Sequence, residues 1–175
     1  MSSPRSATAV CAVLAVALLG GCGFKPLYGS HAGAVSQARL AQVRLAPLRD
    51  RVGQLVHIRL SKTMHPTGKP KRPVWELGMD LKMTTVDLGI RKDETATRAN
   101  LTLDSRFKLT RLDTNRVVFS GRAVITNSYN ILESRFGTVA SRNDAMARAA
   151  RELADNIKTR VALFLAQPRG GGQGP

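Results

Sequence analysis

Three segments that alternate between apolar and polar residues constrain the fold of this chain more than any other feature. In the clearest of them, every second residue is apolar, at Trp75, Leu77, Met79, Leu81 and Met83. The same period of two recurs over residues 101–109 and 117–126. Strict alternation is typical of a strand with one buried side and one solvent-facing side. These segments therefore predict three strands of a sheet.

The connections between these segments predict how the strands pair. Asp113-Thr114-Asn115 is a tight-turn sequence between the last two segments. Residues 87–97 contain Gly89 and a charged stretch, and we expect them to form a hairpin connection. Both connections are short, so the three strands should form an antiparallel meander with one solvent-facing side.

One strand and one helix are predicted before the meander. Residues 40–45 alternate imperfectly and indicate a short first strand. The apolar residues of the segment 52–64 recur at helical spacing, with Asp50 placed to cap the start and Pro66 and Gly68 to stop it. Gly53 lies in the first turn, where glycine is unfavourable, and so indicates close packing.

A long second helix is predicted at the end of the chain. Ser141 followed by Asp144 resembles a capping box. Apolar residues at helical spacing then follow, at Met146, Ala149, Ala150, Leu153, Ile157, Val161 and Phe164. Pro168 should end this helix, and the Gly-rich segment 168–175 is expected to be a disordered tail.

The order strand, helix, three strands, helix predicts an α+β fold. A right-handed crossover through the first helix would make the first two strands parallel. Each helix has one apolar stripe and the sheet has one apolar face, so the simplest fold places two helices on one face of a four-stranded mixed sheet. We expect this single domain to occupy residues 39–167.

The first 21 residues have the features of a secretory signal. They contain Arg5, an apolar run over residues 7–19 that is too short to span a bilayer, and small residues before Cys22. The sequence Leu19-Gly20-Gly21-Cys22 resembles the lipobox of bacterial lipoproteins. That resemblance implies cleavage before Cys22, a covalent lipid on it, and a lipidated tether over residues 22–38. An ordinary signal peptide, or a short buried helix, is the alternative.

The net charge is strongly positive, at +15 for the whole chain. Losing Arg5, the one charged residue of the signal, lowers it to +14. Export argues against nucleic acid as the partner, because the polyanions outside the inner membrane are the phosphorylated head groups of lipids and lipopolysaccharide. Removal of Cys11 with the signal would leave one Cys, so that neither a disulfide nor a Cys-based metal site is expected.

The sequence contains no arrangement that predicts catalysis. We find no Ser-His-Asp or Cys-His pattern and no Gly-rich phosphate loop that precedes a helix. Asp80 and Asp104 could be neighbours across two strands, but the basic residues around them favour an ion network on the sheet. His57 and His65 are eight residues apart without a third ligand nearby. We therefore expect neither an enzyme nor a cofactor other than the lipid on Cys22.

Five basic residues form a candidate binding site. In a meander, the loop that enters the second strand and the turn that joins the third and fourth strands lie at the same end of the sheet. This geometry should bring together a basic cluster made of Lys69, Lys71, Arg72, Arg111 and Arg116. The cluster is a candidate site for the phosphates of a glycolipid such as lipopolysaccharide. Solubility of exposed loops is the alternative explanation.

Three stretches resemble the lipopolysaccharide-assembly lipoproteins of the LptE family. They are residues 22–29 (CGFKPLYG), residues 50–55 (DRVGQL), and a set in the last helix made of Asp144-Ala145, Arg148-Ala149 and Leu153-Ala154-Asp155-Asn156-Ile157. The spacing and the element order fit nearly the whole chain after the signal. The Gly-rich tail and the strongly basic charge have no counterpart in this resemblance.

The resemblance implies a function and partners. It implies a non-enzymatic lipoprotein, anchored on the periplasmic side of the outer membrane, that plugs the LptD β-barrel, helps to assemble it and binds lipopolysaccharide during insertion into the outer leaflet. Gly23 agrees with that location, because some lipoproteins carry Asp after the lipidated Cys as a retention signal. An adaptor or pilot lipoprotein of another envelope complex, which would bind protein and not glycolipid, is the alternative.

Overall fold

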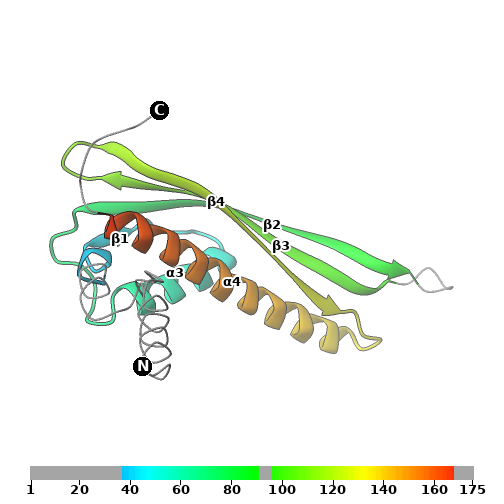
Figure 1. Ribbon diagram of the computed structural model, residues 1–175. Coiled ribbons are helices and arrows are strands. Elements are labelled where there is room, and N and C mark those ends of the chain that lie inside the picture. The colour runs from blue at the N-terminus through cyan, green and yellow to red at the C-terminus, as the bar shows by residue number, and fades with distance from the viewer. Residues whose placement is uncertain (1–36, 91–95, 168–175) are drawn as a thin grey trace, which may run out of the picture.

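A computed structural model describes residues 37–90 and 96–167 (Figure 1). The elements in chain order are β1 (Val43–Leu45), α3 (Arg51–Met64), β2 (Trp75–Ile90), β3 (Ala96–Arg111), β4 (Arg116–Asn130) and α4 (Arg135–Ala166). The predicted order and the α+β fold class are confirmed. The predicted signal, Cys22 and the C-terminal tail lie outside the described residues.

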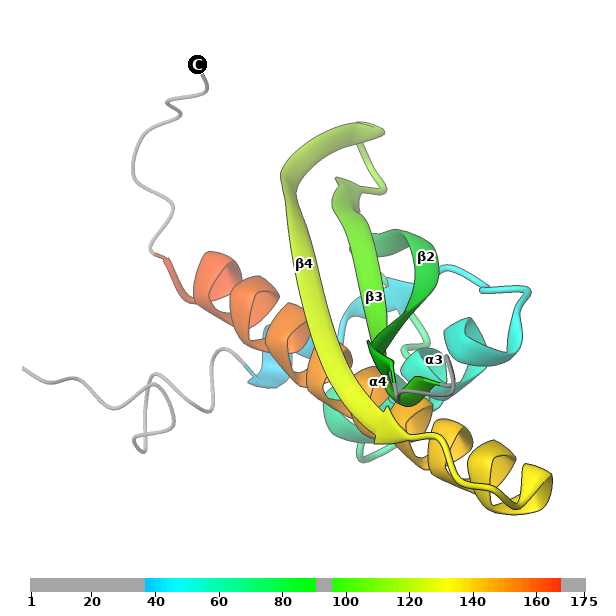
Figure 2. The same ribbon diagram turned by 90° about the vertical axis from the view of Figure 1, so that its right-hand side faces the viewer.

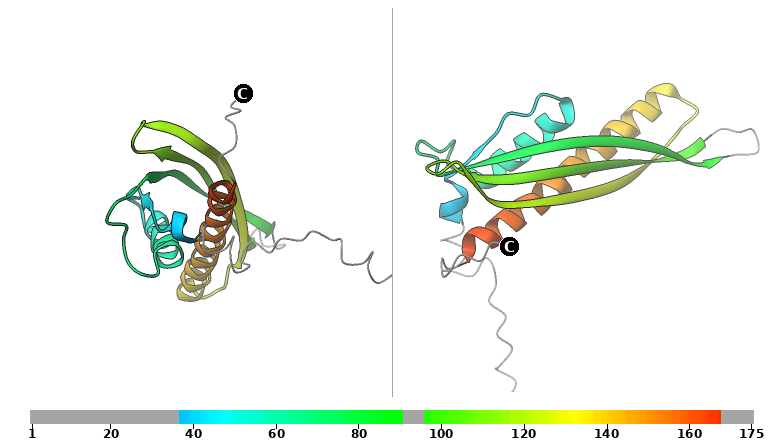
Figure 3. Two further views of the ribbon diagram at one scale, coloured as in Figure 1. Left: turned by 60° about the vertical axis from the view of Figure 1, so that its left-hand side comes forward. Right: turned by 90° about the horizontal axis from the view of Figure 1, so that it is seen from above.

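The four strands form one mixed sheet in the order β1-β2-β3-β4. β1 pairs with β2 in parallel, from Val43 opposite Trp75 to Leu45 opposite Leu77. The β2–β3 and β3–β4 pairs are antiparallel, as predicted for the meander. Both helices cover the same face of the sheet (Figures 1 and 3). The other face of β2, β3 and β4, which we call the outer face, carries no helix of the described residues.

The core lies between the sheet and the two helices. Leu77, Leu103 and Leu109 on the sheet are fully buried, as are Leu153 and Ile157 on α4. Three aromatic rings extend this core. Phe107 and Phe119 contact each other with ring centroids 5.9 Å apart, and Phe119 stacks on Phe164 of α4 at 4.9 Å.

The start of α3 forms as the sequence predicts. The Asp50 side chain accepts a hydrogen bond from the Gly53 backbone N–H, which caps the helix. A Cβ atom on Gly53 would lie 2.6 Å from the Leu48 Cβ atom, so the close packing predicted for this glycine is confirmed. Further along, Arg59 of α3 donates two hydrogen bonds to Asp155 of α4 and connects the helices.

The strands differ in length from the prediction. β2 continues to Ile90 and β3 begins at Ala96, so residues 87–90 and 96–97 of the predicted connection 87–97 belong to the strands. The ladder continues because Asp87, Leu88 and Ile90 find cross-strand partners on β3, which the local sequence does not reveal. β1 is shorter than predicted, since residues 37–40 form a helical turn before it. The charged stretch of the connection 87–97, residues 91–94, lies outside the described residues.

A register shift changes the side on which one residue lies. The β3–β4 pairing is irregular between Leu109 and Thr110, where Leu109 pairs with Phe119 but Thr110 pairs with Val117. Val117 therefore lies on the outer face and is 55 % exposed, whereas the alternation placed it with Phe119 on the buried side. A bulge inserts one residue into one strand and reverses the alternation beyond it.

The last helix begins earlier than predicted. Ser134, and not Ser141, is the N-cap, and its side chain accepts a hydrogen bond from the Gly137 N–H. The predicted cap pair Ser141 and Asp144 lies inside the helix. The first two turns bury no large side chain, although Phe136 and Val139 continue the apolar spacing of the helix. The predicted core-facing residues are otherwise confirmed, except that Phe164 is only half-buried.

The molecule has two unlike ends. At one end, which we call the proximal end, β1, the α3–β2 loop and the β3–β4 turn come together (Figure 1). At the other, distal end, the β2–β3 hairpin reaches beyond the first residues of α4, and Figure 2 looks onto this end. In the part of the chain that the structure describes, no helix has the length and apolarity needed to cross a membrane.

Candidate functional site

The basic cluster is built at the proximal end by the loop 65–74 and the β3–β4 turn. The loop begins with a tight turn in which the Gly68 N–H donates to the His65 carbonyl at 3.1 Å, and Gly68 has a φ of 106°, a conformation that glycine adopts readily. The His65 ring is buried, with its Nε2 atom 2.7 Å from the Val43 carbonyl oxygen. These contacts connect the loop to α3 and β1.

Backbone pairing brings the loop and the turn together as predicted. The Leu112 N–H donates to the Val74 carbonyl at 2.9 Å, so the end of the loop is hydrogen-bonded to the start of the turn. Arg111 and Arg116 are direct partners in the β3–β4 ladder. Asn115 has a φ of 51°, a left-handed conformation that suits asparagine in a tight turn. The two segments therefore share one end of the sheet.

The members of the basic cluster differ in how available their charges are. Lys69, Lys71, Arg72 and Arg116 are exposed and have no ion pair among the described residues. Arg111 instead binds Asp113, with 2.8 Å between the Arg111 Nε and the Asp113 Oδ1. Four free cations thus remain for an anionic ligand.

The pairing of Arg111 with Asp113 lowers the pKa of the Asp113 carboxyl. Burial acts to raise the pKa of its carboxyl, but the hydrogen bond and charge of Arg111, with hydrogen bonds from Thr114, outweigh that effect and hold the pKa below its ordinary value. The carboxylate therefore stays ionised at neutral pH and compensates Arg111. The sequence did not show this pairing, although Asp113 is only two residues away.

The outer face of the sheet carries the predicted ion network. Arg122 donates two hydrogen bonds to Asp104, at 2.9 and 2.6 Å, and these hold the pKa of Asp104 below its ordinary value. Asp80 is not opposite Asp104 but opposite Arg106, while Asp104 is opposite Lys82. The two carboxylates are therefore diagonal neighbours separated by cations, an arrangement that compensates charge.

A shallow groove of about 710 Å³ lies on this outer face. Gly78 has no side chain to fill this part of the outer face. The space beside it is open, since a Cβ atom on Gly78 would meet only Lys108 atoms, at 3.7 Å. Its charged rim has Glu76 and Asp80 on β2 and, on β3 and β4, Arg106, Lys108 and Arg122. Glu76 is already paired with Arg44 at 2.6 Å. The groove therefore combines an uncharged floor with a rim on which Glu76 and Arg122 are paired with residues beside the groove.

Uncharged polar side chains continue this outer face toward the distal end. The hydroxyls of Thr102 and Thr126 lie 2.9 Å apart, and the Ser128 hydroxyl donates to the Asn100 side chain at 2.7 Å. Asn127 is opposite Leu101 and so lies on the side that α4 covers. The outer face is thus mostly polar, but exposed apolar side chains lie among the polar ones at Val86, Leu88, Val117 and Val124.

Metal-binding groups do not gather in the described residues. Across residues 37–90 and 96–167, no three His, Cys, Asp or Glu side chains lie close enough together to hold an ion. His65 is buried at the end of α3, and His57 is half-buried on the same helix.

Sequence reasoning missed one group of exposed residues at the distal end. Leu132, Phe136 and Val139 precede the helix start predicted at Ser141, but they lie at and within the start of α4 and are 50 %, 82 % and 50 % exposed. The signal that could have located this start is Ser134 three residues before Gly137, the spacing at which an N-cap side chain meets a helical N–H.

Comparison with known proteins supports the fold. No protein-family model matches the chain. It is 21 % identical over 152 residues to the uncharacterised protein RP188 of Rickettsia prowazekii, which covers 87 % of this chain and 94 % of that protein.

Several solved structures share the architecture. A candidate lipoprotein from Caulobacter crescentus superimposes with a TM-score of 0.64 at 20 % identity, over 77 % of this chain and 98 % of its own. Rare lipoprotein B from Shewanella oneidensis gives 0.55 at 12 % identity, over 70 % and 93 %. Lipoprotein B from Nitrosomonas europaea gives 0.54 at 12 % identity, over 70 % and 82 %. At these identities the comparisons show a common fold, which this chain shares with lipoproteins.

Proposed function

We propose that this protein is an outer-membrane lipoprotein, anchored through Cys22 on the periplasmic side, that plugs an LptD-type β-barrel, helps to assemble it and binds lipopolysaccharide. Two sequence features support this proposal, namely the lipobox-like Leu19-Gly20-Gly21-Cys22 and the stretches that resemble the LptE family. A fold in common with lipoproteins agrees with it. The protein would act by binding and positioning, without catalysis and with no cofactor other than its lipid.

The observation that carries the plug is the set of paired polar and charged side chains on the outer face of the sheet. The lumen of a large outer-membrane barrel is polar, so a plug inside it needs hydrogen-bonding groups and compensated charges on its surface. The outer face supplies both, through the Thr102–Thr126 and Asn100–Ser128 pairs and the Asp104–Arg122 ion pair. The groove at Gly78 adds a concave surface for a side chain or loop of the barrel wall.

The glycolipid part of the proposal depends on the basic cluster. Lys69, Lys71, Arg72 and Arg116 present unpaired charges at one end of the sheet, which suits the phosphates of a lipid A head group. Each such contact should contribute about 1 kcal/mol and weaken as salt is raised. Arg111 should contribute less, because Asp113 already neutralises it.

The test of the glycolipid site is a binding titration with purified lipopolysaccharide. We expect the quadruple variant K69Q/K71Q/R72Q/R116Q to bind at least tenfold more weakly than the parent. The matched control is K62Q/R151Q/K158Q/R160Q, which lowers the net charge by the same amount through four cations on the helices. It should bind as the parent does, because it leaves the basic cluster intact. Equal losses in the two variants would mean that overall charge alone is responsible and would refute the site.

The test of the plug is co-purification with a barrel. A tagged, lipidated protein should recover one large β-barrel from detergent-solubilised outer membrane. Recovery of a different envelope complex would instead favour the adaptor or pilot function. The two tests are independent, since glycolipid binding can be measured without the barrel.

A further inference from the structure

The apolar stripe of α4 extends beyond the elements that cover it. Phe136 and Val139 lie eighteen residues, or five helical turns, before Ala154 and Ile157, so each pair occupies the same direction around the helix. Ala154 and Ile157 are fully buried, whereas Phe136 is 82 % exposed and Val139 is 50 % exposed. The apolar stripe thus continues to the start of α4, where Phe136 and Val139 are left exposed.

This exposed start is rigidly built. The Thr138 hydroxyl accepts a hydrogen bond from the Leu132 N–H at 2.9 Å and lies 3.0 Å from the Leu132 carbonyl oxygen. Ser134 caps the helix, and a Cβ atom on Gly137 would lie 2.9 Å from Leu132 Cδ1, so the Leu132 side chain packs closely on the glycine. The corner therefore fixes the backbone that carries Leu132, Phe136 and Val139. We call these three residues the distal foot.

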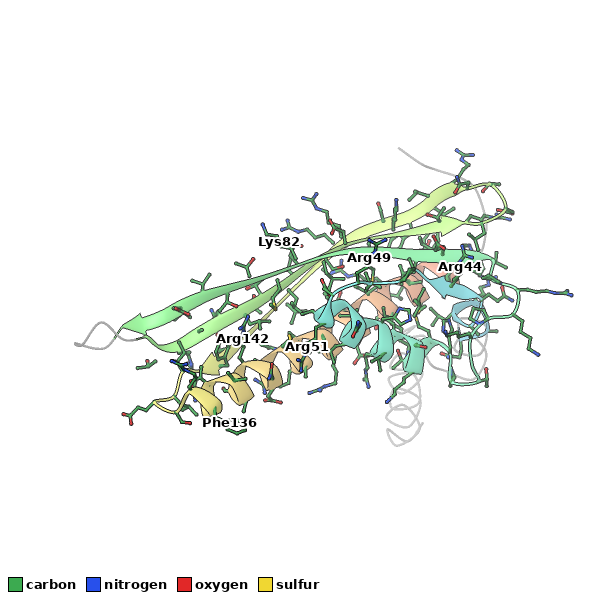
Figure 4. The ribbon with its side chains drawn as sticks, turned by 180° about the vertical axis from the view of Figure 1, so that it is seen from behind. Arg44, Arg49, Arg51, Lys82, Phe136 and Arg142 are labelled. Carbon is green, nitrogen blue, oxygen red and sulfur yellow. The ribbon has the colours of Figure 1, made fainter. Side chains whose placement is uncertain are left out.

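Unpaired arginines surround the distal foot. At 100° per residue, Arg135, Phe136, Val139 and Arg142 fall within an arc of about 120° on α4. Figure 4 shows Phe136 at the tip of this helix and Arg142 further along it. Arg98 on β3 is opposite Asn130, the last residue of β4.

These charges are not compensated locally. None of the three arginines has an ion pair or hydrogen bond within residues 37–90 and 96–167. Glu133 is the acidic residue next to the foot, while the nearby Asp144 is bound to Arg148. The foot is therefore an apolar tip with surplus positive charge.

We propose that the distal foot inserts into the head-group region of an anionic phospholipid bilayer. A protruding aromatic and two aliphatic side chains can enter the interface, while arginines extend their charged ends to the lipid phosphates. A folded protein partner would need a pocket that matches the protruding Phe136, whereas a bilayer deforms around it. The charge complementarity between the arginines and anionic head groups selects this occupant.

The position of the foot makes this a second membrane contact, separate from Cys22. The described chain begins beside the other end of α4, where Arg39 donates to the Leu165 carbonyl. Phe136 is 29 residues earlier on the same helix, roughly 45 Å away. The proposal is independent of the barrel and the glycolipid, because it concerns the opposite end of the molecule from the basic cluster.

The experiment measures binding to vesicles. The chain would begin at residue 22 and carry Cys22→Ser, so that neither the signal segment nor an acyl chain contributes. The vesicles would contain phosphatidylethanolamine with phosphatidylglycerol, and pure phosphatidylcholine would serve as the neutral surface. We expect Phe136→Ser to lower the partition coefficient on anionic vesicles by roughly tenfold or more. The matched control is Leu163→Ser, which removes a 48 % exposed leucine near the other end of α4 and should bind as the parent does.

A second variant gives a signal that does not depend on lost binding. Phe136→Trp should shift its fluorescence to the blue when anionic vesicles are added, since the indole would move from water into the interface. Leu163→Trp should show no shift, and the native Trp75 is buried and so gives a constant background.

Three results would overturn the proposal. The first is equal vesicle binding by Phe136→Ser and the parent. The second is equal fluorescence shifts at positions 136 and 163. The third is loss of barrel co-purification in Phe136→Ser without any vesicle binding by the parent, which would make the foot a protein contact and leave the barrel function standing.

Discussion

Gly121 on β4 allows a sharp test of how the core is packed. An added Cβ atom would lie 2.6 Å from the Phe107 Cζ atom and 3.1 and 3.3 Å from the two Cε atoms, so Gly121→Ala places a methyl group against the end of a buried ring. Phe107 is 3 % exposed and contacts Phe119, which itself stacks on Phe164. The ring therefore cannot move without disturbing the contact between the sheet and α4.

The expected cost follows from that geometry. Overpacking a close-packed core costs about 1–3 kcal/mol, and a rigid ring with two aromatic neighbours favours the upper part of that range. Gly78→Ala is the matched control, because its Cβ atom would lie on the opposite face of the sheet and meet only Lys108 atoms at 3.7 Å. Replacing that glycine should be neutral or stabilise the fold by up to about 1 kcal/mol.

The assay is urea unfolding followed by fluorescence of Trp75, the single tryptophan and a core residue. With a typical urea dependence of about 1–3 kcal/mol per molar, Gly121→Ala should lower the midpoint by roughly 1 M. Adding Phe107→Leu to Gly121→Ala should recover part of the loss, since it removes the ring that the methyl group meets. The proposed aromatic packing would be wrong if Gly121→Ala had the same urea midpoint as the parent, or if Gly78→Ala lowered the midpoint by as much as Gly121→Ala.

Three further predictions concern stability. Leu153→Ala should cost about 2–5 kcal/mol in urea unfolding, because Leu153 is fully buried in the core, and a cost below about 1 kcal/mol would contradict its placement. Asp155→Asn should cost only about 0–1 kcal/mol, since the side chains of the Arg59–Asp155 pair are 39 % and 45 % exposed, and a larger cost would show a stronger link between the helices. The lowered pKa of Asp104 should stabilise the fold above the ordinary aspartate pKa of 3.8, and this contribution should disappear as the pH falls through the lower folded-state pKa. Asp104→Asn should therefore weaken the acid dependence of the unfolding midpoint, and an unchanged profile would refute the role of its pairing with Arg122.

The sequence predicts the architecture well where periodicity is strong. The alternation from Trp75 and the helical spacing around Leu153 each depend on a buried face, and burial leaves a regular pattern. Asp50 and Gly53 were also read correctly, because a cap and a crowded glycine act within one turn. The order of the elements then left few ways to cover one apolar face.

The prediction fails where the deciding contact is distant in sequence. The extension of β2 to Ile90 depends on cross-strand partners in β3, and the bulge that exposes Val117 depends on register. The capping-box pattern at Ser141 and Asp144 placed the start of the last helix too late, because Ser134 is the actual N-cap and the first turns of α4 bury no large side chain. For the candidate site, the meander predicted which segments meet, but not the ion pair that occupies Arg111.

The most direct test of the central claim is recovery of the partner from the outer membrane. The tagged, lipidated protein would be purified from detergent-solubilised outer membrane and its bound proteins identified by mass. The proposed function predicts one large β-barrel in equal stoichiometry, and its loss when polar outer-face residues such as Thr102 and Asn100 are replaced by large charged ones. Recovery of an inner-membrane or secretion complex without a barrel would contradict the plug and favour an adaptor.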